Sequence, residues 1–388
     1  MKIKFLGIFP VSRSQFIGIE TFFFILFFMM TIFFFAYSFP AYIEDPMILF
    51  HARFLKYAAL LSTFFIVIEA QYVFNAMIKQ QKQIIEQQNI KLFEQKEEIA
   101  SQLEIISEQK KNITDGIIYA STIQQALLPE CGEIIKPFDY FILYRPKEIV
   151  SGDFYWCYNH YGRIIIAAAD CTGHGVPGAF MSVLGINNLN EIMARSPQDI
   201  SAAEILERLR SRVIKAFEKK NQSQRRKDGM DIALYIIEPD GKTLQFAGAN
   251  NPLFIIRKNE NDNFPEIDKK ITLTNNDNFT LIQIKGDKMP IGNFKAIHPF
   301  TNHTLTILPD DRLYAFSDGY IDQFGGPYGK RLGTSAFKNL LLSIQDKNME
   351  AQKQILEQTI DEWINSNPDQ RREQIDDMII IGLHLKKQ

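Results

Sequence analysis

The stretch AAADCTGHGVPGAFMSVLG, residues 167–185, decides between two interpretations of this sequence. It contains GHGVPG, which matches the glycine pattern of dinucleotide-binding turns, and the apolar run RIIIAAAD before it predicts a strand. A dinucleotide site needs a second strand that ends in an acidic residue about 20 positions later. Glu191 stands near that distance, but it lies within a helical pattern that is followed by another helical pattern. A phosphate-binding P-loop is excluded because no Gly-Lys-Ser/Thr follows. We therefore interpret the glycines as turn residues, with Pro177 placed to start a helix.

The acid in front of these glycines, Asp170, is one of several that stand at the ends of predicted strands. Asp153 lies in VSGDFYW, Asp318 in RLYAFSDGY, and Asp376 and Asp377 in QIDDMIIIGLHL. Each of these acids alone is typical of a cap or a turn. Together they favour one shared cluster, and buried carboxylates are costly unless they are paired or bound to metal. Ligands that are all oxygens favour Mg²⁺ or Mn²⁺ over Zn²⁺.

Length and composition limit the classes of function. The chain has 388 residues and a net charge of -2, so the overall charge gives no sign of nucleic-acid binding. The three cysteines, Cys131, Cys157 and Cys171, are far apart and form no C-x-x-C pair. This spacing argues against a zinc site and against a disulfide framework, and it is typical of a reduced compartment.

Two apolar segments near the N-terminus predict transmembrane helices, over about residues 21–39 and 57–78, joined by a short loop over about residues 40–55. Glu69 in the second segment either pairs across a helix interface or lies near the headgroups. Basic residues precede the first segment and follow the second, namely Lys2, Lys4, Arg13, Lys79 and Lys82. The positive-inside rule then places both termini and everything after residue 78 in the cytoplasm, at the inner or cytoplasmic membrane.

A heptad pattern begins where the second apolar segment ends. Its members recur every seven residues and are Ile78, Ile85, Leu92, Ile99, Ile106 and Ile113. This stripe predicts a coiled coil, with a weak parallel homodimer through residues 78–117 as one interpretation and a solvated helical spacer as the other. The helical pattern continues to Pro129. We therefore predict a membrane anchor over residues 1–78, a coiled-coil signalling helix and linker over 79–129, and a further domain over 130–388.

The predicted third domain has many strands and two pairs of consecutive helices. Because strands and helices do not alternate one for one, a doubly wound parallel sheet is excluded, and an α+β layered domain is favoured. Two polar segments, residues 219–229 and 257–270, are interpreted as solvated loops.

Five motifs occur in an order and at a spacing that resemble the metal-dependent serine/threonine phosphatases of the PPM family. The motifs are VSGDFYW, DCTGHGVPGAFMS, FAGANNPLFII, FSDGYIDQFGG and IDDMIIIGLHL. The branch with the greatest similarity is the bacterial sporulation and stress-response type, and the resemblance covers about residues 114–386. It implies an α-β-β-α sandwich with two divalent cations, Mn²⁺ or Mg²⁺, at one end.

The resemblance also implies the ligands and the reaction. The metal ligands would be Asp153, Asp170 as the bridging acid, the backbone carbonyl of Cys171, Asp318 and Asp376, with Asp377 as a ligand or beside the ligands. Two bound cations would lower the pKa of a water molecule that attacks phosphorus without a covalent phosphoenzyme. The implied substrate is phosphoserine or phosphothreonine on a regulatory phosphoprotein, such as an antagonist of an anti-sigma factor.

The chain departs from the family pattern at four positions. Thr172 stands where eukaryotic relatives have a general-acid histidine, and His174 is displaced by two residues and is expected to order the turn. Asn250 replaces a histidine of many relatives, and Lys147 is the candidate for the missing phosphate-binding arginine. We name Lys147 and Asn250 as candidate substrate-binding residues.

Two other classes of protein also have this layout of apolar segments, helix and domain. A histidine kinase is excluded because no histidine occurs between His51 and His160, where the coil would need its phosphoacceptor. A catalytically degenerate phosphatase fold that serves as a signalling or scaffold module remains the alternative, although the full set of aspartates argues against it.

Overall fold

The computed structural model describes residues 45–218, 228–260, 264–265, 269–366 and 372–386, with short stretches before residue 45 at 3–5, 9–11, 22, 25–30 and 32–33. The chain divides into two compact units, Met1–Glu108 and Gln109–Gln388, and each is described by itself. Most of the predicted first transmembrane segment and residues 219–227 of the first polar loop lie outside the described residues, as do 261–263 and 266–268 of the second loop.

The first unit contains the strands β1 (Ile3–Phe5) and β2 (Phe9–Val11), which pair antiparallel, and most of the helix α2 (Pro46–Leu127). The sequence predicted a loop over about residues 40–55, which is wrong for residues 46–55 because α2 already begins at Pro46. The Asp45 carboxylate accepts the N–H of Met47 at 2.9 Å, so it caps the helix, and proline is favoured at the first helical position.

The apolar part of α2 is long enough to cross a bilayer. Within the described ranges, one helix passes this test of length and composition, and it is the helix that begins at Pro46. The six members of the heptad stripe lie on the same helix and are all exposed. The helical conformation over residues 79–127 is confirmed, whereas the pairing of two such helices in a coiled coil stays a prediction.

The second unit is built on two antiparallel sheets. One has the order β3-β16-β13-β8-β10-β9, and the other has the order β12-β7-β6-β5-β4 with β11 beside β6. The strands of the first are β3 (Asp139–Arg145), β16 (Met378–His384), β13 (Arg312–Phe316), β8 (Leu253–Lys258), β10 (Phe279–Ile284) and β9 (Ile271–Asn275). Those of the second are β12 (His303–Thr306), β7 (Thr243–Ala249), β6 (Gly229–Ile237), β5 (Arg163–Cys171), β4 (Phe154–His160) and β11 (Ile291–Gly292).

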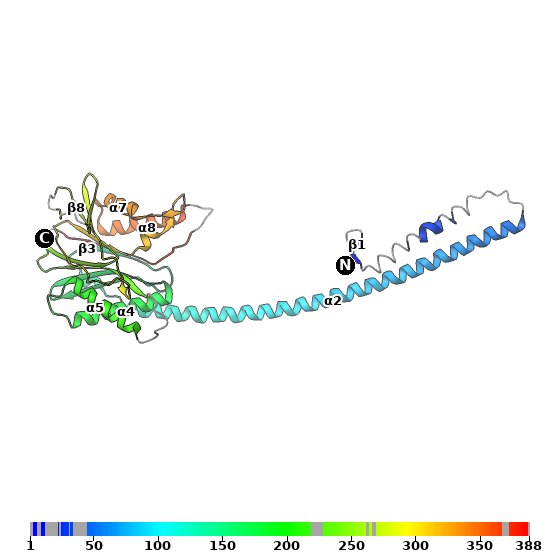
Figure 1. Ribbon diagram of the computed structural model, residues 1–388, viewed down its shortest axis with the longest axis horizontal. Helices are drawn as coiled ribbons and strands as arrows, with labels where there is room; N and C mark the ends of the chain where they lie inside the picture. Colours follow the sequence, from blue (N-terminus) through cyan, green and yellow to red (C-terminus); the bar gives the residue numbers. More distant parts are fainter. Residues whose placement is uncertain are drawn as a thin grey trace. The chain divides into compact units, whose positions relative to one another are not determined.

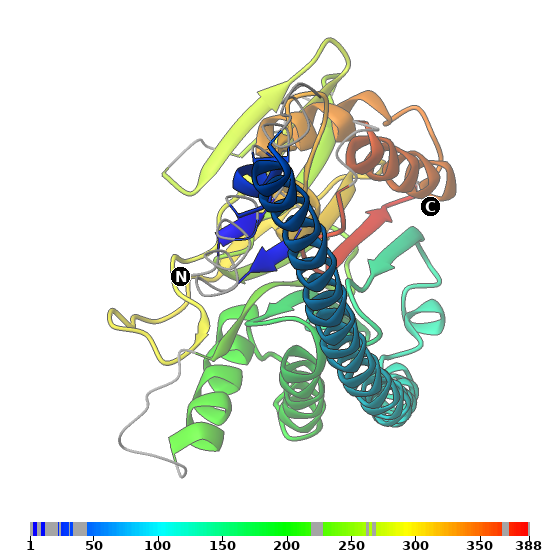
Figure 2. The ribbon, with the colours of Figure 1, turned by 90° about the vertical axis from the view of Figure 1, so that its right-hand side faces the viewer.

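Helices cover the outer faces of both sheets. The pair α4 (Gly175–Ala194) and α5 (Ala202–Glu218) packs on the β5 sheet, and the pair α7 (Thr334–Ser343) and α8 (Met349–Asn365) packs on the β16 sheet. Figure 1 shows these two helix pairs on opposite sides of the sheets, and Figure 2 shows the same order of layers after a quarter turn. The short elements are α3 (Cys131–Ile134), α6 (Gly319–Asp322), β14 (Phe324–Gly325) and β15 (Lys330–Arg331). The predicted α-β-β-α sandwich is therefore confirmed.

The strand β5 shows why the run RIIIAAAD, residues 163–170, is apolar at nearly every position. Side chains alternate between the two faces of a strand. Ile165 and Ala167 pack into the core under α4 and α5, whereas Ile164, Ile166 and Ala168 pack into the core between the two sheets. Both faces of β5 are thus buried, and the strand ends in Asp170 and Cys171 at one end of the sandwich.

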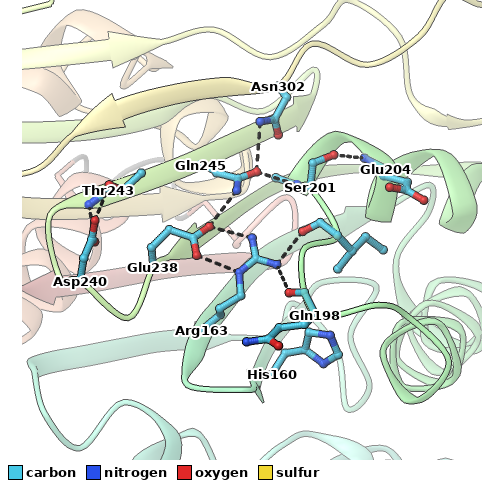
Figure 3. Close-up of polar contacts among 12 residues, drawn as sticks. His160, Arg163, Gln198, Ser201, Glu204, Glu238, Asp240, Thr243, Gln245 and Asn302 are labelled. Atoms are coloured by element: carbon cyan, nitrogen blue, oxygen red, sulfur yellow. Dashed lines mark hydrogen bonds and ion pairs between the residues drawn. The ribbon is translucent and has the colours of Figure 1, made fainter.

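The start of β5 is fixed by a polar network around the buried Arg163 (Figure 3). The Arg163 guanidinium donates to both carboxylate oxygens of Glu238 at 2.9 and 2.7 Å. It also donates to the backbone carbonyls of Gln198 and Ile200, in the connection between α4 and α5, at 2.7 Å each. Gln245 donates to Glu238 at 2.7 Å and accepts from Asn302 at 3.1 Å. These bonds hold the end of β5 that is farthest from Asp170.

One disulfide contradicts the expectation drawn from the cysteine spacing. Cys131 in α3 is bonded to Cys157 in β4, with the two Cα atoms 5.5 Å apart, while Cys171 is free and buried. The spacing could not predict this bond, because the two residues are 26 positions apart and meet only when α3 packs on β4. The bond ties the segment that follows α2 to the strand that follows Asp153.

Candidate metal centre

The predicted acids all lie at one end of the two sheets. Asp153 directly precedes β4, and Asp170 is near the end of β5. Asp318 directly follows β13, and Asp376 and Asp377 directly precede β16. Because β4 pairs with β5 and β13 pairs with β16, the acids approach from both sheets. The fold therefore brings together every carboxylate that the sequence singled out.

Asp153 is, together with Asp377, the most deeply buried of these acids. Its side chain is 2% exposed, and its Oδ2 atom has no hydrogen-bond partner among the described residues. Burial raises the pKa of Asp153 well above its usual value, a hydrogen bond from Ser317 lowers it, and the charges of Asp377, Asp376 and Asp318 raise it further. A buried carboxylate oxygen without a partner is costly, and a bound cation would remove this cost.

Asp170 has the same kind of environment. Burial first, and then the charges of Asp153, Asp318, Asp376 and Asp231, raise the pKa of Asp170 to about 10. The Cys171 thiol beside it is buried, and burial raises its pKa, while the backbone carbonyl of Cys171 is the ligand atom that the resemblance implies.

Asp377 has a positioning role in the loop before β4. Its Oδ1 accepts the backbone N–H of Lys147 and its Oδ2 accepts the backbone N–H of Gly152, each at 2.7 Å. Asp377 therefore uses both carboxylate oxygens to hold the loop that carries Asp153. Asp376 has one oxygen committed, because Oδ1 accepts the N–H of Asp377 at 2.9 Å.

The glycines of GHGVPG are turn residues, as the sequence predicted, and they also allow close packing of the loop. Gly173 and Gly175 have φ angles of +89° and +64°, which favour glycine. A Cβ atom on Gly152 would lie 2.6 Å from the carbonyl oxygen of Gly173, and Gly178 has the same carbonyl as a neighbour. These residues let the turn between β5 and α4 approach the loop before Asp153.

The positions that depart from the family pattern also lie near this centre. His174 Nδ1 is 2.6 Å from Glu148 Oε1 at the N-terminus of α4, consistent with ordering of the turn. Thr172 bonds through Oγ1 to the backbone of Gly229, which makes it structural. The side chain of Lys147 lines two neighbouring cavities of about 410 and 560 Å³.

One acid near the centre was missed by the sequence interpretation. Asp231 in β6 is the direct partner of Asp170 across the β5–β6 pairing, and it accepts a hydrogen bond from the Asn250 side-chain amide at 2.8 Å. Burial raises the pKa of Asp231 to about 6, the bond from Asn250 lowers it, and the charge of Asp318 raises it. The available signal was a single acid inside the apolar run GMDIALYII.

The donor set fits hard divalent cations. In the ranges that the structure describes, no three His, Cys, Asp or Glu side chains converge closely enough to hold an ion as they stand. The chemistry of the acids nevertheless agrees with such an ion, because they are oxygen ligands that raise one another's pKa. The unpartnered Oδ2 of Asp153 is the strongest sign that a cation belongs here.

Comparison with known proteins gives the family. A model of the stage II sporulation protein E (SpoIIE) family matches residues 160–386. The structure of the SiaA-PP2C domain of Pseudomonas aeruginosa is similar with a TM-score of 0.57 and 26% identity, covering 71% of this chain and 98% of that domain.

Two further solved structures are similar at lower scores. One holds the PP2C phosphatase domain and a fragment of the regulatory domain of SpoIIE from Bacillus subtilis, with a TM-score of 0.48, 16% identity, and coverage of 64% of this chain and 63% of that chain. The other is the catalytic domain of the serine/threonine phosphatase PstP in complex with two manganese ions, with a TM-score of 0.42, 12% identity, and coverage of 64% and 99%. No curated protein matches the chain.

The family model spans more than half of the 388 residues, and the two-sheet sandwich with acids at one end agrees with it. The phosphatase fold in turn implies a hydrolase. The chain therefore belongs to the SpoIIE family and carries a PP2C-type serine/threonine phosphatase domain.

Proposed function

We propose that the protein is a membrane-bound phosphatase that hydrolyses phosphoserine or phosphothreonine on a regulatory phosphoprotein. The observation that carries this proposal is the buried Oδ2 atom of Asp153, which lacks a partner in a cluster of carboxylates at the end of a phosphatase sandwich. Such an atom is expected where a cation is held.

Asp153, Asp170, Asp318, Asp376 and the carbonyl of Cys171 would hold two divalent cations, Mn²⁺ or Mg²⁺. When bound, the cations supply a nucleophilic water near neutral pH and offset charge on the phosphoryl oxygens. Asp377 keeps the loop of Asp153 in place through the N–H groups of Lys147 and Gly152.

The substrate would enter beside Lys147. Its backbone N–H is held by Asp377, it lines the two cavities, and its charge acts to lower the pKa of Asp376, so its ammonium group would attract the phosphoryl group. The cavities also contain Arg145, Arg372 and Gln374, which offers polar contacts to the residues that flank a phosphoserine. An antagonist of an anti-sigma factor is the kind of phosphoprotein we propose.

The membrane anchor and the dimer are parts of the same proposal. The apolar start of α2 supports a membrane-spanning segment, with both termini and the phosphatase domain in the cytoplasm. The exposed stripe from Ile78 to Ile113 supports a parallel homodimer through residues 78–117, because a lone helix would leave these side chains in water.

The test is phosphate release by the full chain in detergent micelles, measured on a phosphoserine protein and on a generic phosphate ester. Activity should require Mn²⁺ or Mg²⁺, and Asp170→Asn and Asp318→Asn should each abolish it while the circular dichroism spectrum is kept. A phosphotyrosine peptide should be hydrolysed much more slowly. Activity that survives both substitutions or excess chelator would rule out the metal-dependent reaction. A folded protein that binds cations but releases no phosphate would favour the scaffold alternative.

A further inference from the structure

Asp170 in β5 and Asp231 in β6 stand directly opposite each other in the antiparallel pairing of these two strands. Residues directly opposite in an antiparallel pair lie on the same face of the sheet with their Cβ atoms about 5 Å apart, and like charges there are destabilising. Asp170 follows Ile166 and Ala168 on the face between the two sheets, and Asp231 shares that face with Ala233 and Tyr235. Two acids therefore meet on the inner face of the sandwich.

The charges around Asp231 belong to the same cluster. Asp231 raises the pKa of Asp170, and Asp318 of the opposite sheet raises the pKa of Asp231. Within the part of the chain that the structure describes, Asp231 forms no ion pair with a basic side chain. Asp153, whose Oδ2 is buried without a partner among the described residues, also has Asp318 among the charges around it.

Asn250 holds Asp231 in a defined orientation. Asn250 has a φ of +57°, in the left-handed region, and its backbone N–H donates to the carbonyl of Asp287 at 2.8 Å. Asp287 is itself fixed, because its carboxylate accepts from Lys270 at 2.6 Å and from the N–H of Thr301 at 2.7 Å. The Asn250 side-chain amide then donates to Oδ1 of Asp231 at 2.8 Å and leaves Oδ2 of this carboxylate unoccupied by Asn250.

We propose that Asp231 is a further carboxylate ligand of the divalent-cation centre, beside Asp170, and that Asn250 is its positioning residue. A cation between two opposed acids converts their repulsion into attraction to a shared charge. Asn250 thus acts on the metal through Asp231, as residues that orient metal ligands do. This inference rests on the proposed metal-dependent function, and it assigns Asn250 to the metal centre in place of the substrate.

The experiment is a Mn²⁺ titration of the full chain in detergent micelles, followed by isothermal calorimetry and by the electron paramagnetic resonance of free Mn²⁺. The variants are Asp231→Asn, which keeps the side-chain shape, and Asn250→Gly, which removes the amide and suits a φ of +57°. Asp170→Asn is the reference for a lost ligand. Asp240→Asn is the matched control, because Asp240 is exposed in the turn at the other end of β6.

We expect the Kd for Mn²⁺ to rise at least about tenfold in Asp231→Asn and by roughly tenfold in Asn250→Gly, with no change in Asp240→Asn. If Asp231→Asn does not fold, Asn250→Gly carries the test, because Asn250 is exposed. Wild-type affinity in Asn250→Gly and Asp231→Asn, with weak binding in Asp170→Asn, would overturn the role of Asp231 and leave the proposed function intact. Wild-type affinity in Asp170→Asn as well would remove the cation centre and the inference with it.

Discussion

Gln124, near the end of α2, is bonded to both backbone groups of Ser151. Its Nε2 donates to the Ser151 carbonyl at 2.6 Å, and its Oε1 accepts the Ser151 N–H at 3.1 Å. Nε2 also donates to the hydroxyl of Ser182 in α4 at 2.7 Å. Ser151 lies two residues before Asp153, so one buried amide connects α2, the loop of a candidate metal ligand and α4.

Gln124→Leu should weaken both the fold and the centre. The change leaves the buried N–H of Ser151 without its partner, which costs about 2 kcal/mol in the free energy of unfolding, while the Ser151 carbonyl keeps the bond from the Ser182 hydroxyl at 3.3 Å. Displacement of the Asp153 loop should reduce phosphate release at limiting Mn²⁺ by roughly tenfold. Urea unfolding and a Mn²⁺-dependent activity curve measure the two effects. Gln125→Leu is the control, since Gln125 is exposed on the same turn, and an equal loss there would contradict the role of Gln124.

Stability without cations should fall as the pH rises. The folded pKa values of Asp170, about 10, and Asp231, about 6, lie above the usual 3.8, so the folded protein binds protons that the unfolded chain releases. Above about pH 4 this preference costs stability, and the cost grows until the pH passes each folded pKa. Bound Mn²⁺ replaces these protons, so its affinity should rise with pH. Urea unfolding between about pH 5 and 9 measures the slope of the free energy of unfolding against pH, once with chelator and once with Mn²⁺. A slope in chelator that is flat or rises with pH would contradict the expectation.

The Arg163 network should contribute to the free energy of unfolding but should not affect the affinity for Mn²⁺. Glu238→Gln removes the charge that pairs with a guanidinium only 5% exposed, and loss of one partner of a buried pair costs about 3 kcal/mol. Glu204→Gln is the control, because Glu204 forms an exposed pair with Arg208 that contributes at most about 1 kcal/mol. The Kd for Mn²⁺ should be unchanged in both variants, as Arg163 is at the far end of β5 from Asp170. A large change in Mn²⁺ affinity would show that this network reaches the centre.

The heptad stripe should transmit the state of the membrane segment to the phosphatase. An insertion of seven residues after Ile99 keeps the stripe on one face and should leave activity near its starting level. An insertion of four residues turns the stripe away and should fix activity at a high or a low level. Phosphate release in membranes distinguishes these outcomes. Equal activities for the two insertions would make the helix a passive tether.

The apolar pattern of the sequence predicted a layered α+β domain, and the family resemblance implied its α-β-β-α order. Apolar periodicity marked most of the strands and all four helices of the outer layers, because burial against a sheet leaves a regular pattern. The aspartates at strand ends were found because an acid that borders an apolar run stands out, whereas Asp231 inside such a run was missed. The longer strands β4, β9 and β10 were missed, since FYWCYNH mixes polar and aromatic residues and the other two follow a polar segment. The two-residue strands β11, β14 and β15 were missed because they are too short to show a period.

Only the tertiary structure showed which distant residues meet. The bond between Cys131 and Cys157 depends on the packing of α3 on β4, and the contact of Gln124 with Ser151 depends on where α2 ends. Asp231 became part of the centre only through the register of β5 and β6, because a shift of one residue would turn it to the other face. Local patterns in the sequence determine the elements and the chemistry of their ends. The pairing of strands decides which of those ends lie close enough to bind the same cation, because it sets contacts between residues far apart in the chain.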